Sequence, residues 1–76
     1  MLSSKYSNPI ENFQASGIKE IGDYTYVLLI DLQGQVLIQR IRSDESGIKF
    51  VKKGSQTIEA FWANPASYSY IWVHQL

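Results

Sequence analysis

The ionisable and nucleophilic side chains of this sequence offer few combinations that could do chemistry. The chain has one histidine, His74, and no cysteine. Nucleophilic catalysis needs a Ser, Thr or Cys with a base in reach and a third group that orients the base. A zinc site needs several imidazole, thiolate or carboxylate ligands. We therefore predict that the protein is not an enzyme, has no catalytic, metal or cofactor-binding residues, and uses His74 as a surface or interface residue.

The acidic residues fall in segments that have the composition of turns. Asp23, Asp31, Asp44 and Glu45 each stand next to Gly, Ser or another polar residue, where short polar side chains satisfy local backbone groups. A calcium loop would need oxygen ligands at alternating positions around a glycine and a bidentate Glu, and these segments supply too few. Solvated turns are the expected environment of all four residues.

Aromatic residues alternate near the C-terminus in the pattern of one strand face. The row consists of Tyr68, Tyr70, Trp72 and His74, and small or apolar residues stand between them. If the intervening residues pack inward, the row forms a candidate interface, because Tyr and Trp combine an apolar body with a polar tip. If the row packs inward instead, these aromatics are core residues. The sequence leaves both alternatives open.

Basic residues gather on two predicted strands around a polar turn. They are Arg40, Arg42, Lys49, Lys52 and Lys53. Interleaved with aromatic side chains, such an edge could bind single-stranded nucleic acid. Seven Lys and Arg balance seven Asp and Glu over the whole chain, however, whereas nucleic-acid-binding domains commonly carry a basic excess. This balance favours a solvated sheet end and makes nucleic acid an unlikely partner.

The elements that must position these side chains alternate between strand and turn signals. Seven β-formers at 24–30 predict a central strand, and the Asp31 to Gly34 segment predicts a tight turn with positive φ at Gly34. Strands are predicted at 35–42 and 48–53, with a weak one at 18–21. A short helix buries Ile58, Phe61 and Trp62, with Ser55 or Thr57 as its cap, and ends before Pro65. Residues 66–74 are predicted to form the last strand.

The fold class predicted from this order is α+β. We expect a small antiparallel β-meander of four or five strands with one short helix before the last strand, and the alternative is a small SH3-like barrel. A chain of 76 residues has room for one core. We assign residues 17–76 to a single β-rich domain and residues 1–16 to a flexible or partner-binding arm.

Several segments together resemble small proteins encoded in bacteriophage structural-gene regions. The similarity rests on the strand at 24–31, the Leu37 to Arg40 segment, and the Ala60 to Pro65 segment before the short tyrosine-rich stretch. It implies a role as a virion or assembly component present in many copies, and it brings no site residues. No apolar run is long enough to span a membrane, so we expect no membrane partner and a cytoplasmic location, or a virion location if a phage encodes the protein.

Taken together, these observations predict a non-catalytic structural or assembly module that forms a homo-oligomer and contacts other structural proteins. A single-stranded nucleic-acid-binding domain and an accessory subunit of an enzyme complex are the alternatives. Residues 66–73 contain no charged side chain. Because natural edge strands are usually blunted by charge or paired, we predict that this last segment lies at a subunit contact.

Overall fold

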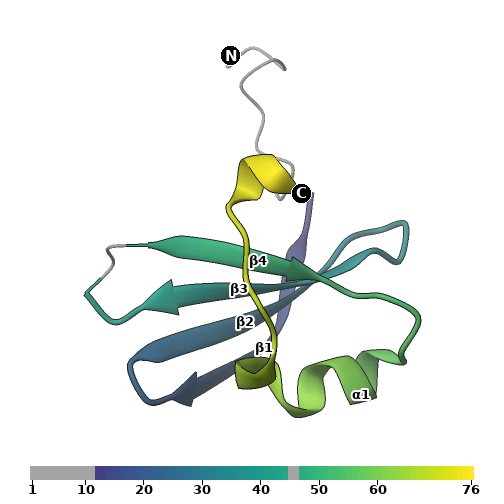
Figure 1. Ribbon diagram of the computed structural model, residues 1–76. Helices are drawn as coiled ribbons and strands as arrows, with labels where there is room; N and C mark the ends of the chain where they lie inside the picture. Colours follow the sequence, from purple (N-terminus) through teal and green to yellow (C-terminus); the bar gives the residue numbers. More distant parts are fainter. Residues whose placement is uncertain (1–11, 45–46) are drawn as a thin grey trace.

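Three successive hairpins build the sheet. In the computed structural model, which describes residues 12–44 and 47–76, the strands are β1 (Gln14–Ile21), β2 (Tyr24–Ile30), β3 (Val36–Arg42) and β4 (Ile48–Lys52). They pair antiparallel in the order β1-β2-β3-β4, and the helix α1 (Ile58–Ala63) follows them (Figure 1). The antiparallel meander and the short helix after it confirm the coarse fold prediction. The sheet is open rather than closed into a barrel.

The turn between β2 and β3 forms as its residue types predict. Gly34 has a φ of 85°, in the left-handed region that glycine enters without steric cost. One carboxylate oxygen of Asp31 accepts hydrogen bonds from the backbone amides of Gln33 at 3.0 Å and Gln35 at 2.7 Å. This turn sets the register in which Ile30 pairs with Val36.

Alternation along β2 and β3 divides the sheet into two faces. We call the face that carries Tyr26, Leu28, Val36 and Ile38 the front, and the face that carries Leu29 and Leu37 the back. Phe61 and Tyr70 complete the front cluster, and Phe50 completes the back cluster. Both faces of the two central strands are therefore buried at the hairpin end, as two apolar faces predict.

Helix α1 covers part of the front face. Thr57 caps it, with its hydroxyl accepting a hydrogen bond from the amide of Ala60 at 3.1 Å. Phe61 is fully buried, and Trp62 lies against Gly17 of β1, where an added Cβ would stand only 3.2 Å from the indole. These contacts confirm Phe61 and Trp62 as the packing face. Ile58 remains 40% exposed, so its predicted burial is wrong.

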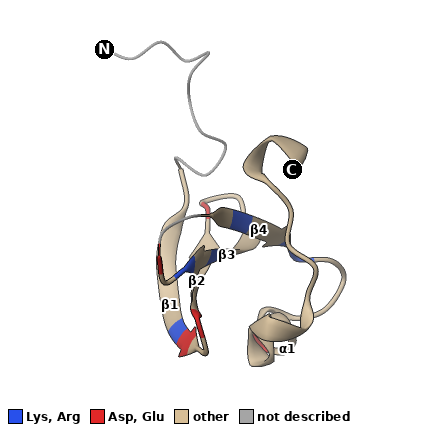
Figure 2. Cartoon of the chain, turned by 60° about the vertical axis from the view of Figure 1, so that its left-hand side comes forward, with Lys and Arg blue, Asp and Glu red and all other residues tan. Residues whose placement is uncertain are grey.

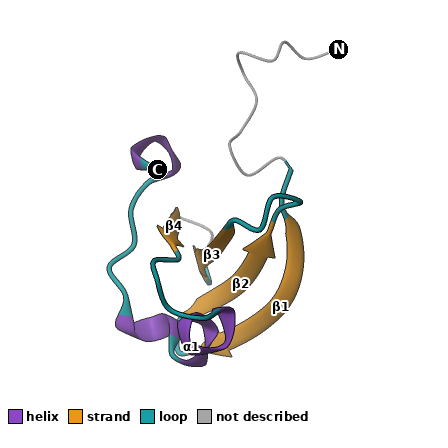
Figure 3. Ribbon diagram, turned by 90° about the vertical axis from the view of Figure 1, so that its right-hand side faces the viewer, coloured by secondary structure: helices purple, strands orange, loops and turns teal. Residues whose placement is uncertain are grey.

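The C-terminal segment crosses the outer edge of β4 instead of forming the predicted strand. It begins with a 3₁₀ turn, η2 (Pro65–Ser67), and ends with another, η3 (Val73–Gln75) (Figures 1 and 3). Its pairing with the sheet is a single bridge between Ile71 and Phe50. The strand prediction is wrong because the phenol groups bond to nearby carbonyls and turn the chain: Tyr68 donates to Phe61 at 3.0 Å and Tyr70 to Pro65 at 2.6 Å.

Strand β1 starts earlier than the weak strand predicted at 18–21. It begins at Gln14, within the segment assigned to the N-terminal arm, and a bulge lies between Ala15 and Gly17. The rest of that arm up to residue 11 lies outside the described residues. No helix in the part of the chain that the structure describes is both long and apolar enough to cross a membrane.

Candidate anion-binding pocket

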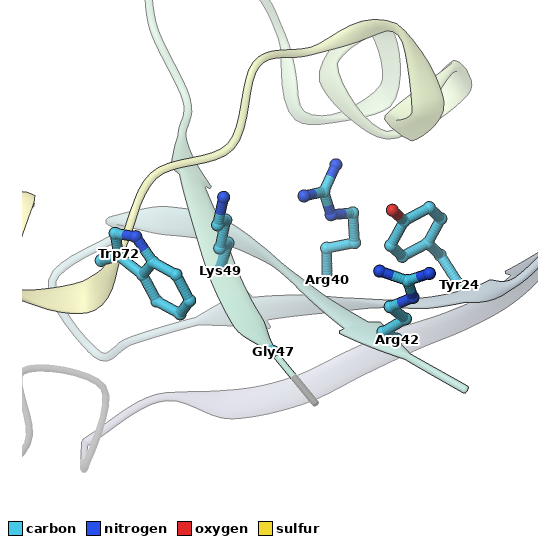
Figure 4. A pocket seen from close by; sticks show the side chains of 6 residues that line it. All are labelled: Tyr24, Arg40, Arg42, Gly47, Lys49 and Trp72. Carbon is cyan, nitrogen blue, oxygen red and sulfur yellow. The ribbon is translucent and has the colours of Figure 1, made fainter. Parts of the chain in front are cut away.

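The end of the front face opposite the β2–β3 turn forms an open pocket. Its cavity has a volume of about 220 Å³, and Figure 4 shows the side chains around it. The lining residues are Tyr24, Arg40, Arg42, Gly47, Lys49 and Trp72. We call this the Arg40 pocket.

Strand register brings the cations of this pocket together. Arg40 of β3 stands opposite Lys49 of β4, and Arg42 stands opposite Tyr24 of β2. Directly opposed residues in an antiparallel sheet share a face. All three cations therefore project from the front face, and Figure 2 shows the basic positions on neighbouring strands β3 and β4.

Arg40 lies between two tyrosine rings. The centre of its guanidinium is 4.5 Å from the ring centroid of Tyr24 and 4.8 Å from that of Tyr70. A guanidinium over an aromatic face is attracted by the negative face of the ring. Because contact with two rings restricts the side chain, the planar fork loses less rotamer freedom when it binds a partner.

The Tyr70 phenol does not ionise in ordinary buffers, so it places no negative charge beside this guanidinium. Burial raises the pKa of the Tyr70 phenol well above its usual value, the nearby Tyr26 raises it further, and Arg40 opposes both effects. The phenol stays protonated and donates its hydrogen bond to the carbonyl of Pro65. Arg40 thus keeps a full positive charge beside a neutral ring.

A second cation and aromatic pair closes the other side of the pocket. The ammonium nitrogen of Lys49 lies 4.7 Å from the Trp72 ring centroid. Trp72 itself is 43% exposed. Gly47 lies beside this ring, since a Cβ added there would be 3.9 Å from the indole. Figure 4 places Trp72 and Tyr24 at opposite sides of the pocket with Lys49 and Arg40 between them.

Only one of the three cations has an acidic partner among the described residues. Arg42 and Asp44 form an exposed ion pair with an N···O distance of 3.9 Å, and such pairs contribute little. In residues 12–44 and 47–76, no carboxylate lies within ion-pair distance of Arg40 or Lys49. Among the described residues, the pocket therefore holds three cations and one carboxylate that pairs with them.

The basic edge predicted from the sequence is divided by the fold. Arg40, Arg42 and Lys49 meet in the pocket, but Lys52 lies beside Leu37 and Phe13 on the back of the sheet. Lys53 donates to the carbonyl of Gln56 at 2.7 Å and to that of Gly54 at 3.2 Å. These last two lysines take no part in the pocket.

The predicted aromatic row is divided as well. Tyr70 is buried and Tyr68 is half-buried against Phe61, so both belong to the front core within one chain. Trp72 and His74 are exposed. The interface hypothesis therefore now concerns Trp72 and His74.

Sequence reasoning missed Tyr24 as a wall of the pocket. The register of the β2–β3 hairpin could have predicted it. Tyr24 and Arg42 are equally distant from the pair Ile30 and Val36 that closes the turn, so they stand opposite each other. Gly47 carried no recognisable signal. Among the described residues, no three His, Cys, Asp or Glu side chains gather in a way that could hold a metal ion.

Comparison with known proteins returned no relatives. No protein-family model matches the chain, and no curated protein and no solved structure is significantly similar to it. The resemblance to bacteriophage structural-gene products is untested by these comparisons and stays a prediction.

Proposed function

We propose that this domain is a non-catalytic binding module that holds an anionic group of its partner in the Arg40 pocket. The observation that carries the proposal is the pair formed by Arg40 and Lys49, each held over aromatic rings and neither paired with a described carboxylate. A fixed guanidinium beside an ammonium suits an oxyanion, because charge-assisted hydrogen bonds are the strong ones.

The lining of the pocket supports binding rather than proton transfer. Its six residues include no carboxylate and no imidazole that could serve as a general base. The pocket instead offers fixed positive charge, the Tyr24 hydroxyl and the flat Trp72 ring. Such a site holds a group in place and leaves it chemically unchanged.

The two tryptophans allow a direct test by NMR. Trp72 lines the pocket, whereas Trp62 packs on Gly17 and Lys19 at the opposite edge of the sheet. Titration of the ¹⁵N-labelled protein with inorganic phosphate, and with acetate for comparison, should shift the Trp72 indole signal and leave that of Trp62 in place. Equal movement of both signals, or of neither, would contradict the proposal.

Three variants distinguish phosphate binding in the pocket from general electrostatic attraction to the protein. Arg40→Met and Lys49→Met should each weaken phosphate binding by at least about fivefold, the equivalent of roughly 1 kcal/mol for a charged hydrogen bond. Lys52→Met is the matched control, since Lys52 is on the same strand as Lys49 but on the other face. If Lys52→Met weakens binding as much, attraction to the whole molecule rather than the pocket is responsible.

We propose further that the module self-associates, through β1. This strand is the end strand of the sheet, and in the described part of the chain nothing pairs with its outer edge. Ile18, at the middle of β1, is 65% exposed. Ile21 of the same strand is 42% exposed, and pairing with a second copy would cover both isoleucines and satisfy the unpaired backbone groups of the edge.

A further inference from the structure

The proposed function leaves open which anion the pocket takes and what carries it. We infer that the ligand is a nucleotide unit, with its phosphate on Arg40, Arg42 and Lys49 and its base against Trp72. This inference rests on the proposed function, because it names the ligand of the same pocket.

Charge favours a phosphate over a carboxylate. Three cations line the pocket, and the one described carboxylate that pairs with them is Asp44, 3.9 Å from Arg42. A carboxylate would offset one of the remaining positive charges, whereas a phosphate monoester carries a charge of about −1.5 to −2 near neutral pH. Arg40 also presents the planar fork that binds phosphate oxygens in pairs.

Size places the rest of the ligand outside the cavity. The volume of about 220 Å³ is smaller than the roughly 300 Å³ at which pockets for drug-sized ligands begin. A phosphate fits within it, and the group that bears the phosphate must lie across the open side. The residues around the opening of the pocket determine which contacts that group makes.

The rim offers an aromatic surface at the correct place. Trp72 is 43% exposed and stands beside Lys49, so an aromatic ring attached to the bound phosphate would lie next to an indole. Every nucleobase has a flat π-face, and stacking of a base on an aromatic side chain is independent of its sequence. A phosphorylated peptide side chain has no such ring beside its phosphate unless the residue is tyrosine. A nucleotide therefore contacts more of the pocket than a phosphoserine or phosphothreonine side chain does.

The decisive measurement compares thymidine 5′-monophosphate with inorganic phosphate by NMR titration of the whole chain. We expect the nucleotide to bind about tenfold more tightly, a gain within the range of one base-stacking contact. Trp72→Leu should remove this gain, so that the nucleotide and phosphate bind it equally well, and Trp72→Phe should restore most of the gain. Leu32→Ala is the control, because Leu32 is a fully exposed residue at the distant β2–β3 turn.

The outcomes distinguish the inference from the proposed function. If phosphate binds and depends on Arg40 but the nucleotide binds no better, the inference is wrong and the proposed function stands. If neither ligand binds, both are wrong. Tighter binding of a phosphoserine peptide than of the nucleotide would also overturn the inference.

A further comparison identifies the source of the nucleotide. A 5′-phosphorylated oligothymidylate that binds at least as tightly as the mononucleotide, with the unphosphorylated strand binding more weakly, indicates the end of a single strand. Binding of the mononucleotide alone indicates a free nucleotide. Either result supports the inference.

Discussion

Arg40 shows how the protein keeps a half-buried cation fixed and still accessible from the pocket. Its methylene stem rises from β3, and the rings of Tyr24 and Tyr70 hold the guanidinium from two sides. An arginine with free rotamers would lose about 2 kcal/mol of conformational entropy when it binds a partner. Restriction by the rings reduces that loss, so the pocket depends on Tyr24 and Tyr70 as much as on the cations.

The burial of Tyr70 predicts an alkaline limit to stability. Because the pKa of its phenol is higher in the folded chain than in the unfolded chain, the folded state holds this proton more tightly. The contribution is complete below about pH 10, the usual pKa of tyrosine, and is lost as the pH rises from there toward the folded value. In urea titrations, the unfolding free energy of the wild type should fall above pH 10 by up to about 1.4 kcal/mol per pH unit.

Tyr70→Phe is the comparison for this prediction. It should cost about 1 kcal/mol at pH 8, because the hydrogen bond to the Pro65 carbonyl is lost. Above pH 10 its stability should decline less steeply than that of the wild type. Parallel curves for the two proteins would show that Tyr70 is not the titrating group.

At the scale of elements, helix α1 covers part of the front core although it has only six residues. So short a helix is not stable alone in water. Its fixed position comes from the Thr57 cap, from Phe61 and from the hydrogen bond between the Lys19 ammonium and the Trp62 carbonyl at 2.7 Å. Packing rather than propensity therefore holds helix α1 in place.

Phe61 carries most of that packing. Its side chain is fully buried between the sheet and Tyr68, so Phe61→Ala should cost about 3–5 kcal/mol. That loss is comparable to the whole stability of a small domain. Thermal denaturation followed by circular dichroism measures it, with Ile58→Ala as the control on the exposed side of the same helix. Equal melting temperatures for the two variants would show that Phe61 is not a core residue.

Local signals made the sheet predictable. Alternation, the Asp31 to Gly34 turn and the polar turn near Asp44 each act within a few residues. The three clear strands formed where these signals placed them, and β1 begins four residues before the weak strand predicted at 18–21. The C-terminal segment was not predictable in this way. Its tyrosines alternate as in a strand, but their hydroxyl groups bond to carbonyls that only the folded chain brings near.

The pocket was predictable only in part for the same reason. Composition identified the basic residues, but a one-residue change of position along β4 decides which face a lysine takes. Lys49 therefore joins Arg40, whereas Lys52 does not. Tyr24 entered the site through register across the sheet, which a reading along the chain alone does not supply.

At the scale of the whole molecule, equal numbers of acidic and basic residues conceal an uneven distribution. Three cations line one pocket, where Asp44 is the described carboxylate that pairs with one of them, while Asp31 and Glu59 lie elsewhere in the chain. With no net charge, the molecule lacks a long-range field that would attract anions from a distance. Binding in the pocket should therefore depend on short-range contacts, as the comparison of Lys49→Met with Lys52→Met would show.

We expect self-association at the β1 edge rather than at the C-terminal segment. The sequence pointed to residues 66–73 as an open strand, but Ile71 pairs with Phe50 and the segment covers the β4 edge. Among the described residues, the open edge is that of β1. Ile18→Lys should therefore lower the mass measured by light scattering at high micromolar concentration, because a charge on an edge strand opposes pairing. Little change in melting temperature is expected, since Ile18 is 65% exposed.

Two further variants make this test specific. Leu32→Lys introduces the same charge at a side chain that is 96% exposed at the β2–β3 turn, away from the β1 edge, and should leave the mass unchanged. Trp72→Arg tests the C-terminal contact expected from the sequence. A lower mass in Trp72→Arg but not in Ile18→Lys would place the contact at the C-terminal segment and contradict the β1 proposal. A wild-type protein that is monomeric at every concentration would contradict both.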